Sequence, residues 1–423
     1  MQNLNLFVSA GEASGDLHAA EVIHFLKEYL PENCTLKAWG MGGQKLKECE
    51  IELIQDSSEM GIIGIADIIK NLGFLYKLEQ NLIAQIRERK PDIALLVDYP
   101  GLNLRLAKAI KKYVPFCKVV FYIAPQVWAW NKNRIKKLPF LIDRLLTILP
   151  FEEDLHKTAG TSTRFVGNPS AWSMQNLHPA TRAQILTACN LNPEHKVIGI
   201  FPGSRKREID YMLPTLLQSA KQLKEKNPDL QFVLVRANTI KQEQIQKYIS
   251  KTGFQPIIET SEKNHYLLKA VDIAWLTSGT VTLEASCTET PLILGYKEYP
   301  LFFKGYLFLR QIDKIGLPNI IANEFICPEL LQDDCIPEKW VAITQEWLNS
   351  PEKLENIKQT LRQKVKEPLT TEVNPAANVA YEILMINQIN KISQENQIHM
   401  RQQAHNNSKK TKQEISQKGI IYN

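Results

Sequence analysis

The chain has 423 residues, of which 44% are hydrophobic and 23% charged, the composition of an ordinary globular protein. Its formal net charge is +6, but residues 387–423 hold six Lys or Arg against two acidic residues, so the rest of the chain is nearly neutral. This balance argues against nucleic acid as a partner. Seven cysteines without a C-x-x-C pair argue against a disulfide framework or a zinc site and favour reduced thiols.

The N-terminal stretch "MQNLNLFVSAGEASGD" lacks the basic and apolar regions of a signal peptide. No apolar run reaches the roughly 18 residues that a transmembrane helix needs. We therefore expect a cytoplasmic protein. The tail over 391–423 is rich in Gln, Asn, Lys and Ser and is predicted to be disordered, with contact to an anionic membrane as the alternative.

Strands and helices alternate through the first part of the chain. Apolar residues repeat with helical spacing over 16–30, and "DIALLVD" is a continuous apolar run, typical of a parallel strand buried on both faces. The predicted elements are strand 4–10, helix 16–30, strand 92–98, helix 104–114 and strands 117–124, 144–150 and 163–169.

A second alternating series begins after residue 172. Its predicted elements are strand 197–204, helix 211–226, strand 230–237, helix 242–251, strand 271–279, helix 280–287 and strand 291–297. Repeated βαβ alternation predicts an α/β protein with two Rossmann-like, doubly wound domains that face a ligand cleft. We place the domains at 1–172 and 173–365, with a C-terminal helix at 366–390 as a candidate to cross back to the first domain.

Neither series contains a nucleotide-binding fingerprint. "GEASGD" follows the first strand, but it is not G-x-G-x-x-G, and no G-x-x-x-x-G-K-[ST] occurs. These absences disfavour a dinucleotide dehydrogenase and a P-loop NTPase. No D-x-D occurs either, so we expect no metal site and no cofactor, and protein groups would neutralise a leaving phosphate.

Asp98 is the first candidate for chemistry. It ends a predicted strand, and Pro100 and Gly101 then turn the chain sharply. Because the carboxyl ends of parallel strands open into the ligand crevice, Asp98 could act as a general base or hold a substrate hydroxyl. The alternative is an aspartate that caps the following turn.

Two loops are candidates for anion binding. "SGTVTLEAS" (278–286) leaves a strand through small residues and enters a helix, so free backbone N–H groups could cradle a phosphate and Glu284 could hold a ribose. An ordinary helix cap is the alternative. "FPGSRKREID" (201–210) has the same character, and Arg205 could bind the same anion bidentately. For Lys206 and Arg207 we expect solvent-facing side chains.

Three apolar or aromatic stretches remain open to two interpretations. Trp128 and Trp130 follow a strand and could stack on a sugar or pack the loop. The stretch 60–78 has an apolar helical face that suits either the core or a lipid surface. The stretch 299–314 mixes aromatic and basic residues, which suits an anionic lipid or a domain interface.

Taken together, these stretches resemble the lipid-A-disaccharide synthase family of inverting glycosyltransferases. The matching segments keep the family's order over roughly residues 4–385. They are "GEASGD" (11–16), "DYPGLN" (98–103), "YIAPQVWAW" (122–130), "ILPFE" (148–152), "FVGNP" (165–169), "PGSRKREI" (202–209), "SGTVTLE" (278–284), "LPNIIA" (317–322) and "PELLQ" (328–332).

The resemblance implies a two-domain fold of the glycosyltransferase-B type. It implies UDP-2,3-diacylglucosamine as donor, 2,3-diacylglucosamine 1-phosphate as acceptor, and UDP and a β-1,6-linked disaccharide 1-phosphate as products. It also implies a peripheral enzyme on the cytoplasmic face of the inner membrane. The alternatives are another UDP-N-acetylglucosamine-using transferase or epimerase of this fold, and a non-catalytic protein that binds a UDP-sugar or lipid.

Matched by position, the family's pattern implies roles for individual residues. Asp98 and Arg205 are the implied catalytic residues. The implied donor-binding residues are Gly203, Ser204, Arg205, Ser278, Gly279, Thr280, Glu284, Asn319 and Gln332. The implied acceptor-side residues are Gly11, Glu12, Ser14, Gly15, Asp16, Trp128 and Trp130.

Two positions depart from the family's pattern. Asn168 stands where V-G-H-P usually has His, and Asn cannot titrate near neutral pH. An essential proton carrier is therefore not expected at that position. Gly64 stands where the family usually has Glu, which weakens any case for a carboxylate there.

Overall fold

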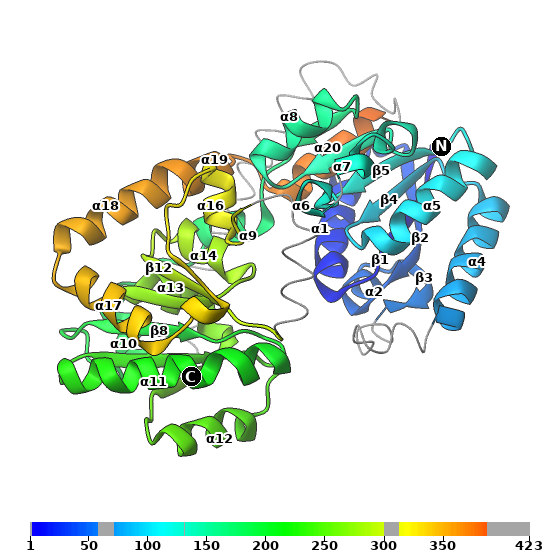
Figure 1. Ribbon diagram of the computed structural model, residues 1–423. Helices are drawn as coiled ribbons and strands as arrows, with labels where there is room; N and C mark the ends of the chain where they lie inside the picture. The colour runs from blue at the N-terminus through cyan, green and yellow to red at the C-terminus, as the bar shows by residue number, and fades with distance from the viewer. Residues whose placement is uncertain (1, 58–71, 131, 300–312, 387–423) are drawn as a thin grey trace. The chain divides into compact units, whose positions relative to one another are not determined.

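The computed structural model describes residues 2–57, 72–130, 132–299 and 313–386 and divides the chain into two compact α/β units (Figure 1). Unit 1 contains Met1–Pro169 and the chain from Thr371 onward, and unit 2 is Ser170–Thr370. The first and the last described residues therefore belong to the same unit. Its last described helix, α20 (Pro375–Ile386), packs against α1 (Ala13–Tyr29) of unit 1.

Unit 1 is built on a seven-stranded, wholly parallel sheet with strand order β3-β2-β1-β4-β5-β6-β7. The order reverses between β1 and β4, so a crevice opens at the carboxyl ends of these two strands. The strands are β1 (Gln2–Ala10), β2 (Cys34–Gly42), β3 (Glu52–Asp56), β4 (Ile93–Val97), β5 (Lys118–Tyr122), β6 (Arg144–Thr147) and β7 (Thr163–Phe165).

Helices cover both faces of this sheet because alternate side chains of each strand point to opposite faces. Leu4, Leu6 and Val8 of β1 pack with α1 and α20, whereas Phe7 packs on the other face with α4 (Leu72–Arg89) and α5 (Pro100–Tyr113). Glu382 of α20 also forms ion pairs with Arg144 and Arg164, which fasten this helix to the strands β6 and β7.

Unit 2 repeats this plan with a six-stranded parallel sheet of order β10-β9-β8-β11-β12-β13. Here the order reverses between β8 and β11, which pair directly, so the loops that follow these two strands adjoin. The strands are β8 (Val197–Phe201), β9 (Gln231–Arg236), β10 (Ile257–Thr260), β11 (Ile273–Thr277), β12 (Leu292–Tyr296) and β13 (Glu329–Leu331).

The helices of unit 2 bury two separate cores. On one face α11 (Lys206–Lys226) and α17 (Pro337–Leu348) pack around Trp275 and Trp340. The opposite core includes residues of α10 (Arg182–Ala188), α13 (Asn264–Ala270) and α14 (Val281–Cys287). The predicted helix over 211–226 begins earlier, at Lys206, because the Glu208 carboxylate accepts the backbone N–H of the N-cap residue Arg205.

Several sequence predictions fall outside the described residues. These are the tail over 391–423, Gly64, residues 60–71 of the stretch 60–78, and residues 300–312 of the stretch 299–314. The side chain of Trp130 is likewise not described. Within the described ranges, no helix combines the length and the hydropathy needed to cross a membrane.

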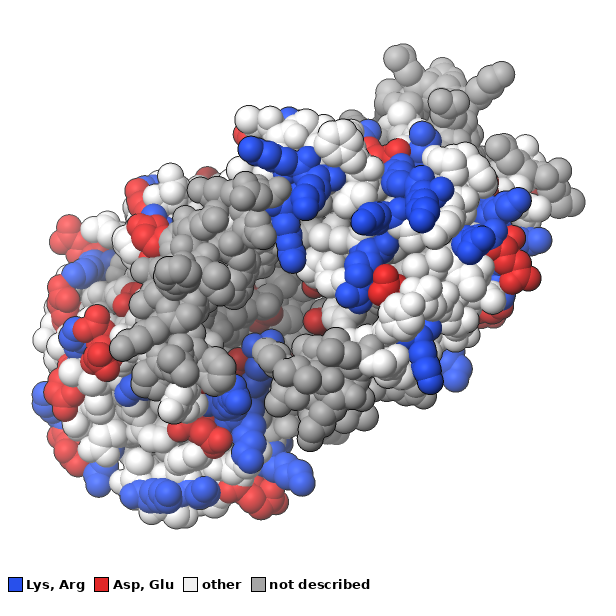
Figure 2. All heavy atoms as spheres, turned by 45° about the vertical axis from the view of Figure 1, so that its right-hand side comes forward, with Lys and Arg blue, Asp and Glu red and all other residues white. Residues whose placement is uncertain are grey.

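Exposed apolar side chains mark the carboxyl edge of the unit 1 sheet. Leu17 lies in the first turn of α1, and Phe74 and Tyr76 lie in the first turns of α4. Both turns lie at this edge, because α1 follows β1 and α4 ends just before β4 begins. Lys and Arg side chains gather on the face of unit 1 that Figure 2 presents.

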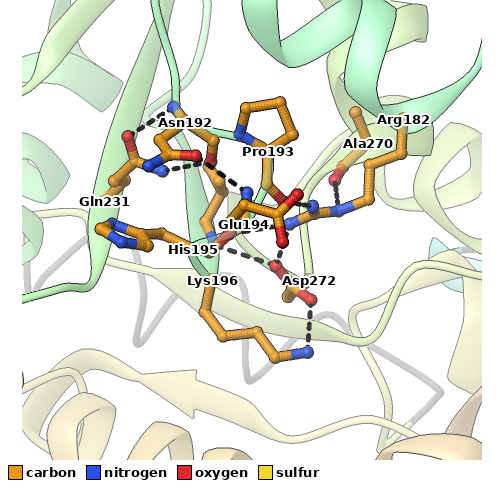
Figure 3. A network of polar contacts seen from close by, with 10 residues as sticks. Arg182, Asn192, Pro193, Glu194, His195, Lys196, Gln231, Ala270 and Asp272 are labelled. Atoms are coloured by element: carbon orange, nitrogen blue, oxygen red, sulfur yellow. Dashed lines mark hydrogen bonds and ion pairs between the residues drawn. The ribbon is translucent and has the colours of Figure 1, made fainter.

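In unit 2, a network of charged side chains connects the amino ends of β8 and β11 (Figure 3). These ends lie at the edge of the sheet opposite to the candidate loops. Asp272 accepts hydrogen bonds from Arg182 (2.8 Å), Lys196 (2.8 Å) and the backbone N–H of Val197 (2.9 Å). Arg182 also donates to the backbone carbonyls of Pro193, His195 and Ala270. One carboxylate thus ties helix α10 to two strands.

Replacing Asp272 by Ala should lower the free energy of unfolding by about 2 kcal/mol, because three donors, two of them charged, lose their shared acceptor. Urea unfolding followed by circular dichroism measures this loss. Glu352→Ala, an exposed acidic residue at the start of α18 (Pro351–Leu361), is the control and should change stability by less than about 0.5 kcal/mol. Equal midpoints for the two variants would contradict the structural role of Asp272.

Candidate active site

Asp98 lies at the strand-order reversal of unit 1, directly after β4, in a strained turn. Asp98 and Tyr99 both have left-handed backbone conformations, with φ of 48° and 46°. Each such non-glycine residue costs on the order of 1 kcal/mol or more and persists only where its surroundings enforce it. Consecutive strained residues at the carboxyl edge of a parallel sheet indicate a functional turn.

Asn103 holds this turn in place from the interior. Its Nδ2 donates to the backbone carbonyls of Asp98 (2.7 Å) and Val97 (3.2 Å), and its Oδ1 accepts from the Ser9 hydroxyl (2.7 Å). The Tyr99 ring lies against Gly11, where a Cβ would come within 2.6 Å of the ring. Gly11 is therefore required by the close approach of the two loops that follow β1 and β4.

The pKa of Asp98, a predicted catalytic residue, depends on Glu12 of the predicted acceptor-side motif "GEASGD". Burial raises the pKa of Asp98, and the negative charge of Glu12 raises it further. The backbone N–H of Tyr99 and the nearby His18 act in the opposite direction on this pKa. A carboxyl group whose pKa is raised is a stronger base than an ordinary aspartate, as general-base catalysis requires.

The remaining residues of "GEASGD" have different positions. Glu12 and Ser14 are exposed at the carboxyl edge, and Gly15 packs against Val97. Asp16 is buried and accepts from the backbone N–H groups of Gly43 (2.7 Å), Lys45 (2.8 Å) and Leu46 (3.2 Å). Its carboxylate therefore caps the short helix α2 (Gln44–Glu48), which sequence reasoning did not anticipate.

Trp128 is buried in the short helix α6 (Val127–Trp130), which follows β5, and its contacts are those of a packed side chain. Its Nε1 donates to Glu152 Oε1 (3.0 Å), and its ring packs edge-on against Phe151. Burial raises the pKa of Glu152 to about 7, against the lowering effect of the Trp128 hydrogen bond. Nearby, Asn168 donates to the Ile148 carbonyl (3.2 Å), so it supports the same group of loops.

In unit 2, the loop after β8 carries Arg205, and two of its backbone N–H groups already form hydrogen bonds within the unit. Gly203 has φ of 108°, and the Arg205 side chain is 84% exposed. Glu208 Oε2 accepts from the N–H groups of Ser204 (2.8 Å) and Arg205 (3.1 Å). The Ser204 and Arg205 N–H groups of this loop are therefore occupied by a carboxylate, whereas the Arg205 guanidinium is exposed.

The loop after β11 is open by comparison. Gly279 and Thr280 are exposed, and a Cβ at Gly279 would meet nothing within 4 Å. Ser278 donates its N–H to the Gly295 carbonyl (3.2 Å), which fixes the start of the loop against β12. Because β8 and β11 are neighbours, this open loop adjoins the loop that carries Arg205.

Glu284 is held by the preceding helix α13. Its Oε2 accepts from Asn264 Nδ2 (2.7 Å) and lies 3.7 Å from His265 Nε2. These contacts orient the carboxylate predicted to bind a ribose. Sequence reasoning missed Asn264 and His265, because their role depends on two helices that are adjacent only in the fold.

Asn319 occupies the interior, where its side chain is 0% exposed. Its amide donates to the Cys327 carbonyl and to Glu329, and its Oδ1 accepts from the N–H groups of Ile326 and Cys327. Glu329 also accepts from the N–H groups at the start of α16 (Leu317–Ala322). The Asn319 side chain thus shapes this loop, and its assignment to the donor site stays a prediction.

Gln332 combines strain with an unmet hydrogen-bonding group. It follows β13 with φ of 49°, and within the described residues its buried Nε2 has no acceptor. Thr277, at the end of β11, has a hydroxyl that is also buried and, in the same ranges, without a partner. Buried polar groups are nearly always paired, so these two at the carboxyl edge are candidates to bind a ligand. The described residues contain no metal-binding cluster of three or more His, Cys, Asp or Glu.

Two parallel α/β units, each with candidate residues where its strand order reverses, define the two-domain fold of glycosyltransferase-B enzymes and related sugar-nucleotide epimerases. The UDP-N-acetylglucosamine 2-epimerase from Neisseria meningitidis, solved with UDP-GlcNAc, is similar with a TM-score of 0.58 and 15% identity over 91% of this chain and 100% of that chain. A putative epimerase from Listeria monocytogenes gives 0.59 and 13%, over 92% and 97%. At these identities the likeness shows the fold alone.

Sequence comparison identifies the family. The model of the lipid-A-disaccharide synthetase family matches residues 6–384. The lipid-A-disaccharide synthase of Geobacter metallireducens is 35% identical over 87% of this chain and 93% of its own length, and that of Nitrosococcus oceani is 35% identical over 84% and 89%. The chain belongs to the lipid-A-disaccharide synthetase family and is a glycosyltransferase.

Replacing Asn103 by Ala should reduce the rate of sugar transfer by about 100-fold, because the Asp98 turn loses its interior anchor and small displacements of catalytic groups are costly. Steady-state kinetics on folded protein measures this effect. Asn378→Ala is the control: it removes a similar amide-to-carbonyl bond, to Val166, away from the turn. Asn378→Ala should lose about 1 kcal/mol of stability and Asn103→Ala roughly 2 kcal/mol, because it removes three hydrogen bonds, so both variants are compared as folded protein. Equal transfer rates would show that Asn103 does not position Asp98.

Proposed function

We propose that the protein is a lipid-A-disaccharide synthase. It transfers 2,3-diacylglucosamine from UDP-2,3-diacylglucosamine to 2,3-diacylglucosamine 1-phosphate and releases UDP. The family match over nearly the whole chain supports this reaction. The structural observation that carries it is the direct pairing of β8 with β11, which brings the 203–205 and 278–280 loops together at one strand-order reversal.

The proposed donor site lies on unit 2. The diphosphate of UDP binds between the two loops, where the exposed Arg205 guanidinium neutralises the charge that grows on the leaving UDP. The open 278–280 loop offers backbone donors to the same phosphates. Glu284, oriented by Asn264, accepts hydrogen bonds from the ribose, and the unpartnered Nε2 of Gln332 donates to an oxygen of the donor.

The proposed acceptor site lies on unit 1 around Asp98. Asp98 accepts the proton of the acceptor 6-hydroxyl as that oxygen attacks the anomeric carbon, and the C–O bond to UDP breaks in the same displacement. A single displacement inverts the anomeric centre and gives the β-1,6 linkage. The strained turn and the raised pKa of Asp98 support its assignment as the base.

The proposed location is the cytoplasmic face of the inner membrane, as a peripheral protein. Both substrates carry acyl chains that need an apolar surface. Leu17, Phe74 and Tyr76 are exposed at the same edge of the sheet as Asp98, which supports entry of lipid substrates there. The cationic side chains on unit 1 (Figure 2) suit anionic headgroups.

A direct assay tests the reaction. Purified protein is incubated with both substrates without added metal, and the disaccharide 1-phosphate is sought by mass spectrometry, with UDP measured in parallel. The donor alone serves as the control, because an epimerase would change the UDP-sugar without an acceptor. Folded protein that forms no disaccharide would refute the proposal, and a non-catalytic binder would release no UDP.

The pH profile tests Asp98 as the base. Because its pKa is raised, kcat should fall with decreasing pH at values above the ordinary aspartate range, as the base becomes protonated. Glu12→Gln removes a charge that raises this pKa, so it should move the acidic limb to lower pH. Glu32→Gln, exposed beyond the far end of α1, should leave the limb in place.

The same proposal predicts a large effect of removing the base itself. Asp98→Asn should reduce kcat about 1,000-fold and abolish the acidic limb. Single-turnover measurements at saturating substrate separate this chemical effect from binding. Near-normal turnover in Asp98→Asn would assign the base to another residue.

A further inference from the structure

The carboxylate of Glu208 occupies the anion-binding position of the loop after β8. Its Oε2 accepts from the N–H groups of both Ser204 and Arg205, and its Oε1 lies 3.4 Å from the Arg205 guanidinium. The Glu208 side chain is largely buried, although the Arg205 side chain is exposed. The carboxylate thus makes the contacts that a phosphate group would make with this loop.

The loop is shaped to receive this carboxylate. A Cβ at Gly203 would clash with Glu208 Oε2, so only glycine permits the close approach. On the other side of the loop, the Thr239 hydroxyl donates to the Ser204 carbonyl (2.6 Å). The position of Glu208 is therefore fixed relative to Arg205 and is not that of a solvated side chain.

Helix capping alone does not require a negative charge here. A Gln side chain at this position could receive the same two backbone N–H groups, because its amide oxygen is also an acceptor. The helix α11 that follows is 21 residues long and buries eight of them, so packing stabilises most of it. The negative charge of Glu208 lies 3.4 Å from the Arg205 guanidinium and partly offsets its positive charge.

We propose that Glu208 is an internal competitor of the UDP diphosphate: it occupies the N–H groups of the 203–205 loop, offsets the charge of Arg205 and so limits the affinity for UDP. This inference rests on the proposed donor site. The competition by Glu208 would speed product release, because a loop that bound the diphosphate with every available donor would retain UDP after transfer. Glu208 is a residue that tunes affinity and takes no part in the chemical step.

The test is the dissociation constant of UDP, measured by isothermal titration calorimetry with the full-length protein. Glu208→Gln keeps the cap and removes the charge, and it should bind UDP about tenfold more tightly than the wild type at low salt. This advantage should shrink as ionic strength rises. Glu243→Gln, an exposed acidic residue in the first turn of α12 (Gln242–Thr252), is the matched control and should match the wild type.

A second variant guards against a folding defect. Glu208→Ala removes the charge and frees both N–H groups, so it should also bind UDP, and inorganic pyrophosphate, more tightly than the wild type. Thermal unfolding verifies that each variant is folded. A purely structural Glu208 predicts unchanged or weaker binding in both variants, and that result would overturn the inference. Wild-type protein that binds no UDP would instead refute the proposed donor site.

Discussion

The structure depends on one constraint, which is the reversal of strand order in each parallel sheet. In a doubly wound sheet the connections after the two strands at the reversal cross to opposite faces of the sheet, so a crevice remains at the carboxyl ends of these strands, between their adjoining loops. In unit 1 this place lies after β1 and β4, and in unit 2 it lies after β8 and β11. The residues with the strongest chemical signals, Asp98 and Arg205, follow β4 and β8. The strand order of each sheet therefore determines where these two residues lie.

Backbone strain distinguishes these loops from ordinary turns. Several left-handed residues, such as Glu50 and Asn190, follow the ends of helices, where this conformation is common. Asp98, Tyr99 and Gln332 instead follow the carboxyl ends of the strands β4 and β13. The hydrogen bonds of Asn103 enforce the strain at Asp98, and this cost is explained if the turn must present a carboxylate at a fixed position.

The sequence predicts much of this arrangement because its signals are local. Continuous apolar runs identify β4, β5, β8 and β11, and their alternation with helices predicts the α/β class, which the fold confirms. The partners of the candidate residues were not predictable, since they come from distant segments. Ser9 and Asn103 are 94 residues apart, and Asn264 contacts Glu284 from a different helix. The motifs that contain Asp16 and Asn319 suggest ligand-binding roles, but the hydrogen bonds of these two side chains to other segments become visible only in the fold.

The buried carboxylates show how polar residues with a structural role can be distinguished from polar residues that are available to bind a ligand. Asp16 and Glu329 each accept several backbone N–H groups at the start of a helix, and so they have little capacity left for a substrate. Gln332 presents the opposite case, because its buried donor lacks an acceptor among the described residues. A buried donor without a partner is costly, so it favours any ligand that supplies an acceptor. Glu208 lies between these cases: its bonds are satisfied, but the loop that satisfies them faces the place where an anion is proposed to bind. Satisfied hydrogen bonds therefore identify a structural residue only where no ligand competes for the same donors.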